Sequence, residues 1–540
     1  PACGRMGVGL VEDDVPNYRL QADGQGMFPT IQAAINTVPN LADIWLEPGT
    51  YSGPGNRDLD LMGKDVNIFA FGGYPDGIVL DAGGSASDPH RHFNATSGST
   101  NILNQLKLVN GYASGALGTK GGSVLVSGTS DLMLSSCIFE NNFAPDSGSD
   151  VHVQDGERLY ALNCQFINSS QRFSVSGETV HDFEIRNGSV AGDRGGVVVD
   201  GSGSNCYLHV QHVRFEPSGG PSIDIRNLSG YYTSGLVETS TFAAALGYSS
   251  VRVENSQNIQ ISACTMSTEL TSLGEDRVVA LDSTVDFDDC VFSGGAENPA
   301  GRAVLGTNAN LTFSQCDFMD YNSSPNEGIV SSLGGTLGLD GCNFTNSSTC
   351  VSLTDVSESS ILNSTFSGNQ GTPALGVTNS STSVSNSSFT NNTSSVNGGA
   401  IASTTSNLSL DTCTLQGNTS QTKGGAIIVE GGVVSLTNCL LEGNQGSQGG
   451  AIHSHIGSTT LTGSTFSGNT ALYGGAISGF NTALNIVDCD ISGNNANQHG
   501  GIYLNNCDPS LVDGCLISNN TVVARGSGIG IASCDPTISA

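Results

Sequence analysis

The sequence is poor in charge, in large aromatic residues and in long hydrophobic runs. Of its 540 residues only 12% are charged, six are Met and one is Trp. No apolar run reaches the roughly 18 residues of a membrane-spanning helix, so we expect no membrane insertion. Helix-forming runs rich in Ala, Glu, Lys and Leu are also missing, which argues against a helical-repeat protein.

Basic residues are scarce as well. The chain has 18 Lys and Arg against 49 Asp and Glu, a net charge of −31. Such a surface repels nucleic acid, so we expect no nucleic-acid partner. We expect no cofactor either, with surface calcium as the one ion that an acidic exterior would attract. The chain begins at Pro1 without an initiator Met or a leader, as a mature secreted product or an excised segment would.

Glycine, with 72 residues, and small polar residues dominate instead. In the C-terminal half a Gly-Gly-Ala-Ile motif or a variant of it recurs every 25 or 26 residues, beginning at Gly398, Gly424, Gly449, Gly474, Gly500 and Gly526. A second marker, an apolar residue followed three positions later by Asn, runs in phase: Phe366/Asn369, Phe389/Asn392, Leu415/Asn418, Leu441/Asn444, Phe466/Asn469, Ile491/Asn494 and Ile517/Asn520. The apolar marker extends back through Phe344, Phe318, Phe292, Met266, Phe242, Phe215, Phe166, Phe139 and Leu108, with Val190 as a weaker member.

A period near 25 with alternating apolar and polar residues inside it predicts one solenoid turn of three short strands. Leu408 and Leu410, for example, face inward on one strand, and Asp411-Thr412 form the corner that follows. Asp or Asn recurs at this corner because both tolerate left-handed backbone: Asp340, Asn386, Asn438, Asp488 and Asp513. Successive coils lie about 4.8 Å apart, so the Asn ladder can hydrogen-bond along the axis. The fold class is therefore all-β, a right-handed parallel β-helix of about seventeen coils.

The N-terminal end differs from the repeat. Residues 29–37 predict a short amphipathic helix, in which Ile31, Ala34 and Ile35 share one face. We expect this helix to cover the open edge of the first coil. Residues 1–52 are thus predicted to form an N-terminal cap and residues 53–540 a β-helix, with the clearest repeats in residues 361–534.

Two of these patterns carry a resemblance. The helix followed by IWLEPGTYSG, residues 44–53, resembles the opening of pectin-lyase-like β-helix proteins. The GGAI and FSGN repeats are similar to those of the polymorphic outer-membrane protein family. The resemblance covers essentially the whole chain and implies a parallel β-helix. It does not imply an activity, because that fold hosts lyases, hydrolases, adhesins and surface passengers alike.

Ten of the 15 cysteines lie two residues before the apolar marker and so point inward beside it. They fall into pairs on neighbouring coils, which we predict to form disulfides: Cys137/Cys164, Cys264/Cys290, Cys316/Cys342, Cys413/Cys439 and Cys489/Cys515. Cys507/Cys534 is a sixth candidate pair, and a ladder of free thiols is the alternative. Cys3, Cys206 and Cys350 are unassigned, and the absence of Cys-x-x-Cys argues against zinc.

The chain also carries many Asn-x-Ser/Thr sequons, although a sequence this rich in Asn and Ser produces several by chance. Most are predicted at corners, where a glycan can project, and they favour an extracellular glycoprotein over a bacterial surface protein. The candidate acceptors are Asn94, Asn168, Asn187, Asn227, Asn310, Asn322, Asn343, Asn346, Asn363, Asn379, Asn386, Asn391, Asn392, Asn407, Asn418 and Asn519.

A search for an active site finds no complete pattern. The resemblance implies Asp clusters with an Arg or Lys base for a lyase, but only Asp288-Asp289 matches a hydrolase motif, and it lies at a corner. The densest titratable region spans residues 145–215: Asp150, His152, Asp155, Arg158, His181, Asp182, Arg186, Asp193, Arg194, His209, His212 and Arg214. Carboxylates there could bind calcium while Arg186 or His181 abstracts a sugar proton, or the residues could form cross-strand ion pairs.

We therefore predict no catalytic and no metal-binding residues, and a non-enzymatic extracellular structural protein. The repeat continues almost to Ala540 without a capping element, so we expect either further chain or end-to-end self-association into a filament. An adhesin or carbohydrate-binding surface passenger, with a glycan or cell-surface ligand, is the alternative. A calcium-dependent polysaccharide lyase is a further alternative.

Overall fold

The computed structural model describes residues 18–72, 74–96, 98–156, 158–168, 173–191, 195–201, 206–216, 220–228, 234–242, 248–267, 276–294, 301–321 and 328–539. It is an all-β parallel solenoid of about 18 turns, with 55% of its residues in strands and 3% in helices. The predicted fold class is confirmed. The chain divides into two compact units, Pro1–Gly188 and Ser189–Ala540, here called unit 1 and unit 2. No helix within the described residues is long and apolar enough to cross a membrane.

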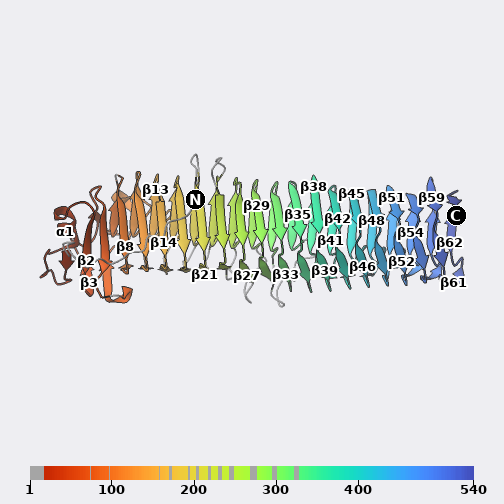
Figure 1. Ribbon diagram of the computed structural model, residues 1–540, viewed down its shortest axis with the longest axis horizontal. Helices are drawn as coiled ribbons and strands as arrows, with labels where there is room; N and C mark the ends of the chain where they lie inside the picture. Colours follow the sequence, from red (N-terminus) through yellow and green to blue (C-terminus); the bar gives the residue numbers. More distant parts are fainter. Residues whose placement is uncertain are drawn as a thin grey trace. The chain divides into compact units, whose positions relative to one another are not determined.

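The strands of unit 1 form three parallel stacks (Figure 1). The first stack contains β4 (Leu59–Asp60), β7 (Phe93–Ala95), β10 (Val124–Ser127), β13 (Val151–Gln154) and β16 (Val175–Glu178). The second contains β1 (Tyr18–Leu20), β2 (Ala42–Leu46), β5 (Val66–Ala70), β8 (Thr100–Asn104), β11 (Asp131–Ser135), β14 (Arg158–Leu162) and β17 (Asp182–Arg186). The third contains β3 (Gly49–Ser52), β6 (Ile78–Asp81), β9 (Lys107–Val109), β12 (Ile138–Glu140) and β15 (Gln165–Ile167). Two short 3-10 helices, η1 (Pro75–Gly77) and η2 (Gly115–Leu117), lie in the loops.

Helix α1 (Ile31–Thr37) lies within the predicted range 29–37 and packs on the coil that contains β4. Thr30 caps its N-terminus by accepting the N–H of Ala33, and Ile31 and Ile35 are fully buried. At the other end the Lys64 ammonium donates to the carbonyls of Ile35 and Val38 at 2.8 and 2.9 Å. A cation there binds the last, unpaired carbonyls and opposes the negative end of the helix dipole.

Unit 2 repeats the same three stacks. The first contains β19 (Val197–Asp200), β22 (Ile223–Arg226), β25 (Val251–Glu254), β28 (Val278–Leu281), β31 (Val304–Thr307), β34 (Val330–Leu333), β37 (Val351–Thr354), β41 (Leu375–Thr378), β50 (Ile452–His455), β54 (Ile477–Phe480), β58 (Ile502–Asn505) and β62 (Ile529–Ala532). The second contains β20 (Tyr207–Gln211), β23 (Ser234–Glu238), β26 (Ile259–Ser262), β29 (Thr284–Asp288), β32 (Asn310–Ser314), β35 (Thr336–Asp340), β38 (Glu358–Leu362), β42 (Ser381–Ser385), β51 (Ser458–Thr462), β55 (Ala483–Val487), β59 (Ser510–Asp513) and β63 (Thr537–Ser539). Two long strands, β45 (Ile401–Asp411) and β48 (Ile427–Thr437), belong to both stacks.

The third stack of unit 2 consists of two- and three-residue strands. It contains β18 (Ser189–Ala191), β21 (Arg214–Phe215), β24 (Thr241–Phe242), β27 (Thr265–Ser267), β30 (Val291–Ser293), β33 (Asp317–Met319), β36 (Asn343–Thr345), β39 (Thr365–Ser367), β43 (Ser388–Thr390), β46 (Thr414–Gln416), β49 (Leu440–Glu442), β52 (Thr465–Ser467), β56 (Asp490–Ser492) and β60 (Leu516–Ser518). Two small additional sheets follow it, one of β40 (Gln370–Gly371), β44 (Thr393–Ser394) and β47 (Thr419–Ser420), the other of β53 (Thr470–Tyr473), β57 (Asn495–Gln498) and β61 (Thr521–Arg525).

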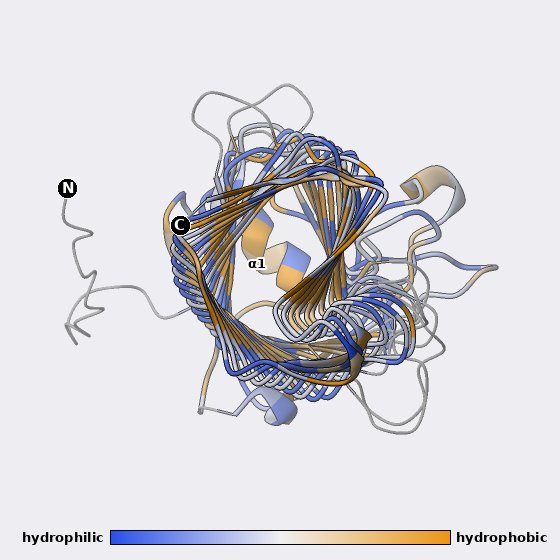
Figure 2. Ribbon diagram, turned by 90° about the vertical axis from the view of Figure 1, so that its right-hand side faces the viewer, coloured by the Kyte–Doolittle hydropathy of each residue, from blue (hydrophilic) through white to orange (hydrophobic). Residues whose placement is uncertain are grey.

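The predicted ladders fill the interior of unit 2. The apolar marker forms a stack of parallel rings, with the centroids of Phe318 and Phe344 4.5 Å apart. Leu408 and Leu410 face inward as expected. Viewed along the coils, the strands carry the hydrophobic residues, in orange, and the corners are mostly hydrophilic (Figure 2). One detail of the corner prediction is wrong: after Asp340 and Asp513 the left-handed residue is the following glycine, Gly341 or Gly514, because it has no Cβ to clash.

Candidate functional site

In unit 1 the side chains of the titratable region that sequence analysis singled out contact residues close to them. Arg158 lies opposite Asp182 on the neighbouring strand, with Nε 3.6 Å from Oδ2. Asp150 is buried and accepts a hydrogen bond from Nδ2 of Asn142 at 2.8 Å. His152 is also buried, which lowers its pKa to about 3 and keeps the ring neutral at physiological pH. These side chains bond within their own coil or to the next coil.

The two residues proposed as a lyase base do not meet a carboxylate cluster. Nε of Arg186 pairs with Glu184 on its own strand, β17, and His181 is exposed at the turn before that strand. Asp155 accepts a hydrogen bond from Thr179 at the corner. Within the part of the chain that the structure describes, no group of three His, Cys, Asp or Glu side chains could hold a metal ion.

The unit 2 members of this region are paired in the same way. Nε2 of His209 lies 2.7 Å from Glu238 on the next strand, and Nε of Arg214 lies 2.8 Å from Glu216. His212 occupies a left-handed corner with φ 51°. Asp193 and Arg194 lie outside the described residues. Cross-strand ion pairs account for Arg158 and His209, whereas Arg186 and Arg214 each pair with a carboxylate two residues away in the sequence.

Sequence analysis missed a second titratable cluster in unit 1. The His90 ring lies between two carboxylates, with Nδ1 on Asp58 and Nε2 3.2 Å from Asp88. Asp58 also accepts the backbone N–H of Arg91 at 3.0 Å. Asp58 lies at one end of a strand, and His90 and Asp88 lie in a loop about 30 positions later. Neither their spacing nor a motif indicated that they lie close together.

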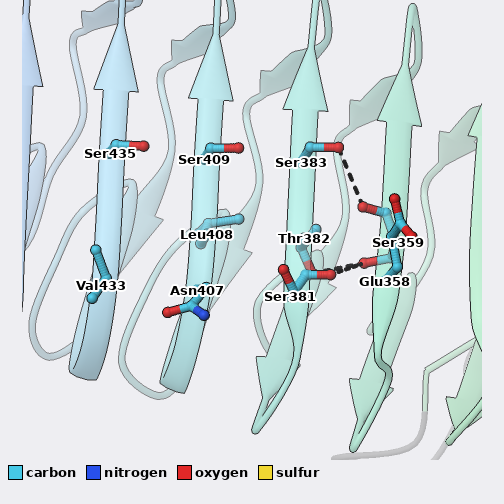
Figure 3. Close-up of a pocket in the computed structure, with 10 residues that line it drawn as sticks. All are labelled: Glu358, Ser359, Ser381, Thr382, Ser383, Asn407, Leu408, Ser409, Val433 and Ser435. Carbon is cyan, nitrogen blue, oxygen red and sulfur yellow. Dashed lines mark hydrogen bonds between the residues drawn. The ribbon is translucent and has the colours of Figure 1, made fainter.

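One concave surface in unit 2 is a shallow groove of about 250 Å³ across the second stack (Figure 3). Its floor is a row of serines on neighbouring strands, Ser383, Ser409 and Ser435. Serine is small, so this row is lower than the rows beside it. The remaining lining residues are Glu358, Ser359, Ser381, Thr382, Asn407, Leu408 and Val433.

The chemistry of this groove is that of hydrogen bonding. Hydroxyl and amide groups donate and accept, and they are spaced about 4.8 Å apart along the axis by the coil rise. Glu358 is the one titratable residue of the lining. A lone carboxylate without a base, an acid or a metal partner does not form an acid–base pair. The groove lining therefore offers hydrogen-bonding groups and a single carboxylate.

The sequons receive a structural explanation. Nine of them have a left-handed Asn at a corner, as Asn386 does with φ 49°. The next residue, Ser387, belongs to a buried ladder, and Ser388 begins the next strand. The nine are Asn168, Asn187, Asn227, Asn346, Asn363, Asn379, Asn386, Asn391 and Asn519. Corner geometry thus produces the motif without reference to glycans, although most of these side chains are exposed.

Two sequons must be removed from the candidate acceptors. Asn392 and Asn418 are fully buried, and each Nδ2 donates to Oδ1 of the next Asn in the ladder, at 2.9 Å and 3.0 Å. A glycan on either nitrogen would have to occupy the core. Asn94, Asn310, Asn343 and Asn407 are exposed or half-buried on strands, and Asn322 lies outside the described residues.

The cysteines take the place of serines in one buried ladder. Sγ of Cys413 donates to the carbonyl of Asp411, two residues back, as Oγ of Ser387 in the preceding coil donates to Ser385. Burial raises the pKa of the Cys164 thiol, which keeps it protonated and unreactive. The described cysteines are unbonded, so the five disulfides predicted beside the apolar marker stay a prediction.

Thiol contacts distinguish these pairs. Thiols of neighbouring coils influence each other's pKa in Cys137/Cys164, in Cys413/Cys439 and along Cys264, Cys290, Cys316 and Cys342. Cys489 and Cys515 interact only electrostatically. Cys206 and Cys350 are buried, and Cys3 lies outside the described residues.

The sixth candidate pair, Cys507 and Cys534, is not joined in the structure. Both thiols are free, and Sγ of Cys507 donates to the carbonyl of Asn505 at 3.3 Å instead of contacting Cys534. Cys507 is buried, whereas Cys534 is only half-buried, because Cys534 follows β62 in the last coil that the structure describes. Like the other five pairs, Cys507/Cys534 therefore stays a prediction.

Comparison with known proteins agrees with this architecture. A model of the family described as right handed beta helix region matches residues 249–419 and 398–539. No curated protein matches the chain. Among solved structures, a mutant of the PL6 family alginate lyase AlyGC aligns at 10% identity and a TM-score of 0.29, over 97% of this chain and 100% of that one.

Two further structures align at similar levels. A mannuronic acid specific family 6 polysaccharide lyase from human gut microbiota shows 10% identity and a TM-score of 0.22, over 83% of this chain and 86% of that one. The periplasmic alginate epimerase AlgG shows 9% identity and a TM-score of 0.19, over 87% and 83%. Likeness at these scores carries no argument about activity. The family match covers more than half of the sequence, and the chain belongs to the right-handed β-helix family.

Proposed function

We propose that this chain is a non-enzymatic extracellular structural protein that self-associates. The observation that carries the proposal is the buried ladder of asparagines from Asn369 to Asn520. Each amide binds its neighbour above and below, and its Nδ2 also binds a backbone carbonyl, as Asn444 does to Leu415 at 2.9 Å. Because the repeated asparagines bond each coil to the next, they favour a stiff structural protein.

The surface supports the same interpretation. The cations of the titratable region are bound by carboxylates next to them, which leaves the acid–base chemistry of a lyase without a defined centre among the described residues. The exposed corner asparagines are acceptable sites for N-glycans, which would protect a long β-sheet protein from non-specific lateral aggregation. The repeats that resemble the polymorphic outer-membrane protein family fit a location at the cell surface.

The proposal is tested by two measurements on the purified protein. Incubation with polygalacturonate, alginate and neutral glycans should release no unsaturated uronides and no reducing ends, with or without calcium. Sedimentation velocity should show a sedimentation coefficient that rises with concentration. Release of unsaturated products, lost on Arg186→Ala or His181→Ala, would instead establish the lyase alternative.

A second candidate function is glycan binding, which the serine-floored groove favours. Hydroxyls and amides on a fixed lattice suit a neutral, extended polysaccharide. Binding to a neutral glycan should therefore be lost in Ser409→Trp, which fills the floor of the groove. Ser467→Trp, on β52 in the third stack, is the matched control and should leave binding unchanged. Equal binding by both variants would exclude the groove.

A further inference from the structure

Unit 2 carries one row of side chains that begins and ends with a cation. The row runs through five successive coils just before the first-stack strands, and consists of Lys423, Gln448, Tyr473, Gln498 and Arg525. Four coil steps separate Lys423 from Arg525, about 19 Å. Neither cation makes an ion pair with any residue that the structure describes. We call this the cationic row.

The same five coils carry a second row on another surface. It runs along the ends of the second-stack strands and consists of Asp411, Thr437, Thr462, Val487 and Asp513. Here a carboxylate stands at each end, again four coil steps apart. Asp411 is exposed and Asp513 half-buried, and neither makes an ion pair within the described residues. We call this the acidic row.

The two rows match in charge and in spacing. The spacing is the same in both, because one coil rise sets both rows. The two rows cannot meet within one chain. The cationic row lies beside the small sheet of β53, β57 and β61, whereas the acidic row lies at the ends of β45, β48 and β59. Two parallel or antiparallel chains set side by side would bring cation to carboxylate at both ends of the contact.

The centre of the cationic row is suited to contact with protein. Tyr473 and its neighbour Leu472 are 36% and 49% exposed, and the Tyr473 and Tyr503 rings lie 6.0 Å apart. The centre of the acidic row is formed by Thr462, with Val487 next to it. Aromatic residues such as Tyr473 are enriched in protein interfaces, and the facing threonine and valine methyls would receive the ring without a buried charge.

We propose that the cationic row docks on the acidic row of a second copy of this chain. The contact joins two different surfaces, so it is heterologous, and each copy keeps free the one surface that it has not used. It therefore propagates into an open lateral assembly. This inference rests on the proposed structural function, to which it adds the surfaces that make contact.

The proposal predicts salt-sensitive association. Exposed ion pairs are weak one by one and are screened by salt, so the wild-type protein should associate at about 0.02 M salt and dissociate at about 0.5 M. Charge reversal tests the pairing directly. Lys423→Glu/Arg525→Glu and Asp411→Lys/Asp513→Lys should each raise the concentration needed for association by about fivefold or more in sedimentation velocity.

Mixing the two reversed variants should restore association. In the mixture each reversed row finds an oppositely charged partner on the other variant, so the expected result is recovery of the wild-type sedimentation behaviour. Both rows already accept varied side chains in neighbouring coils, which makes these changes compatible with folding. Circular dichroism verifies the fold before mixing.

The control keeps the row and the charge change but alters the spacing. Asp288→Lys/Asp340→Lys lies on the same line of second-stack residues, with only two coil steps between the carboxylates. This variant should associate like the wild type. If it weakens association as much as the acidic-row variant, or if the reversed variants do not rescue each other, the pairing is wrong although the protein self-associates. If wild type stays monomeric at all salt concentrations, the proposed structural function fails as well.

Discussion

The side-chain amide of Asn418 donates through Nδ2 to Oδ1 of Asn444 at 3.0 Å, and the backbone N–H of Asn418 donates to the same oxygen at 2.9 Å. Both residues are completely buried. One oxygen thus satisfies two donors of the coil before it, while Nδ2 of Asn444 passes the pattern on to Asn469 at 3.0 Å. A buried polar network of this kind is stable because every member is bonded.

Replacing one member should therefore damage two coils. Asn444→Leu conserves volume but leaves the backbone N–H of Asn418 and one N–H of its Nδ2 without their acceptor, and it removes one hydrogen bond to the Leu415 carbonyl. Each orphaned buried group costs about 1–3 kcal/mol, so we expect a loss of about 3 kcal/mol or more in the free energy of unfolding of the structure. Chemical denaturation measures it. The exposed neighbour Gln445→Leu is the control and should change stability little; equal effects of the two variants would contradict the ladder's role.

Buried histidine should make unit 1 sensitive to acid. His92 is fully buried, with Nε2 3.0 Å from two carbonyls and Nδ1 2.8 Å from Ser123, and burial lowers its pKa to about 4. An unfolded histidine titrates near 6.5. Stability from this residue is therefore complete above about pH 6.5 and falls as pH drops toward 4, by about 3 kcal/mol in all.

The measurement is the slope of unfolding free energy against pH between about 4 and 6.5. His92→Gln should flatten that slope, whereas the exposed His181→Gln should not. NMR titration of the native protein gives a second readout that does not depend on the variant. A His92 ring that takes up its proton near pH 6.5 would show that the assignment is wrong.

Replacing a second buried histidine should raise the stability of the protein. His453 is completely buried, and neither ring nitrogen has a hydrogen-bond partner among the described residues. The equivalent position in the preceding coil is Ile428. His453→Ile should raise the free energy of unfolding by about 1–3 kcal/mol, because it removes unpaired polar atoms from the core.

The control for this variant lies two positions further along the same strand. His455 binds Glu430 at 2.8 Å and faces Phe480 of the following coil. His455→Phe likewise introduces the residue found at the equivalent position of the neighbouring coil. It leaves Glu430 without its partner, so it should not stabilise the protein. Stabilisation by His455→Phe and none by His453→Ile would refute the argument from unpaired nitrogens.

The oxidation state of Cys413 and Cys439 decides how these residues contribute. If the predicted disulfide forms, Cys439→Ser should cost about 3 kcal/mol by reopening a loop of roughly 25 residues. In the reduced protein the same change should cost little, because Ser464 already occupies the equivalent position in the next coil. Alkylation under denaturing conditions followed by mass spectrometry counts the free thiols. Full alkylation without reductant would exclude the disulfide.

The interior was predictable from the sequence, because every coil imposes the same demand on equivalent positions. Phe366 and Asn369 recur with the coil period, since each must meet its counterpart above and below. The burial of Asn392 was implied by that ladder, but the same residue also satisfies a sequon, and the two interpretations could not be separated without the fold. The helix at 31–37 was predictable from its apolar face alone.

The surface was less predictable, because outward positions carry no shared constraint. The serine row through Ser383, Ser409 and Ser435 keeps the coil period, but serine is so common here that the row does not stand out. The approach of His90 to Asp58 and Asp88 depends on the path of a loop. Lys423 and Arg525 became recognisable as a pair only when register placed them on one line.

The pairing of Cys507 with Cys534 shows the same limit. Its spacing of 27 residues from Cys507 and the shared Asp-Pro that follows both cysteines suggested a pair. Spacing places two residues on neighbouring coils but does not fix the direction of their side chains, and a disulfide requires that direction as well as the distance. Cys534 is half-buried and unbonded, and only the fold could show that.

Electron microscopy of the purified protein, at rising concentration and low salt, tests the central claim most directly. Self-association predicts particles that gather side by side or end to end, and that separate when salt is raised. Isolated particles at every concentration and salt, from material that also cleaves a polysaccharide, would contradict a structural role.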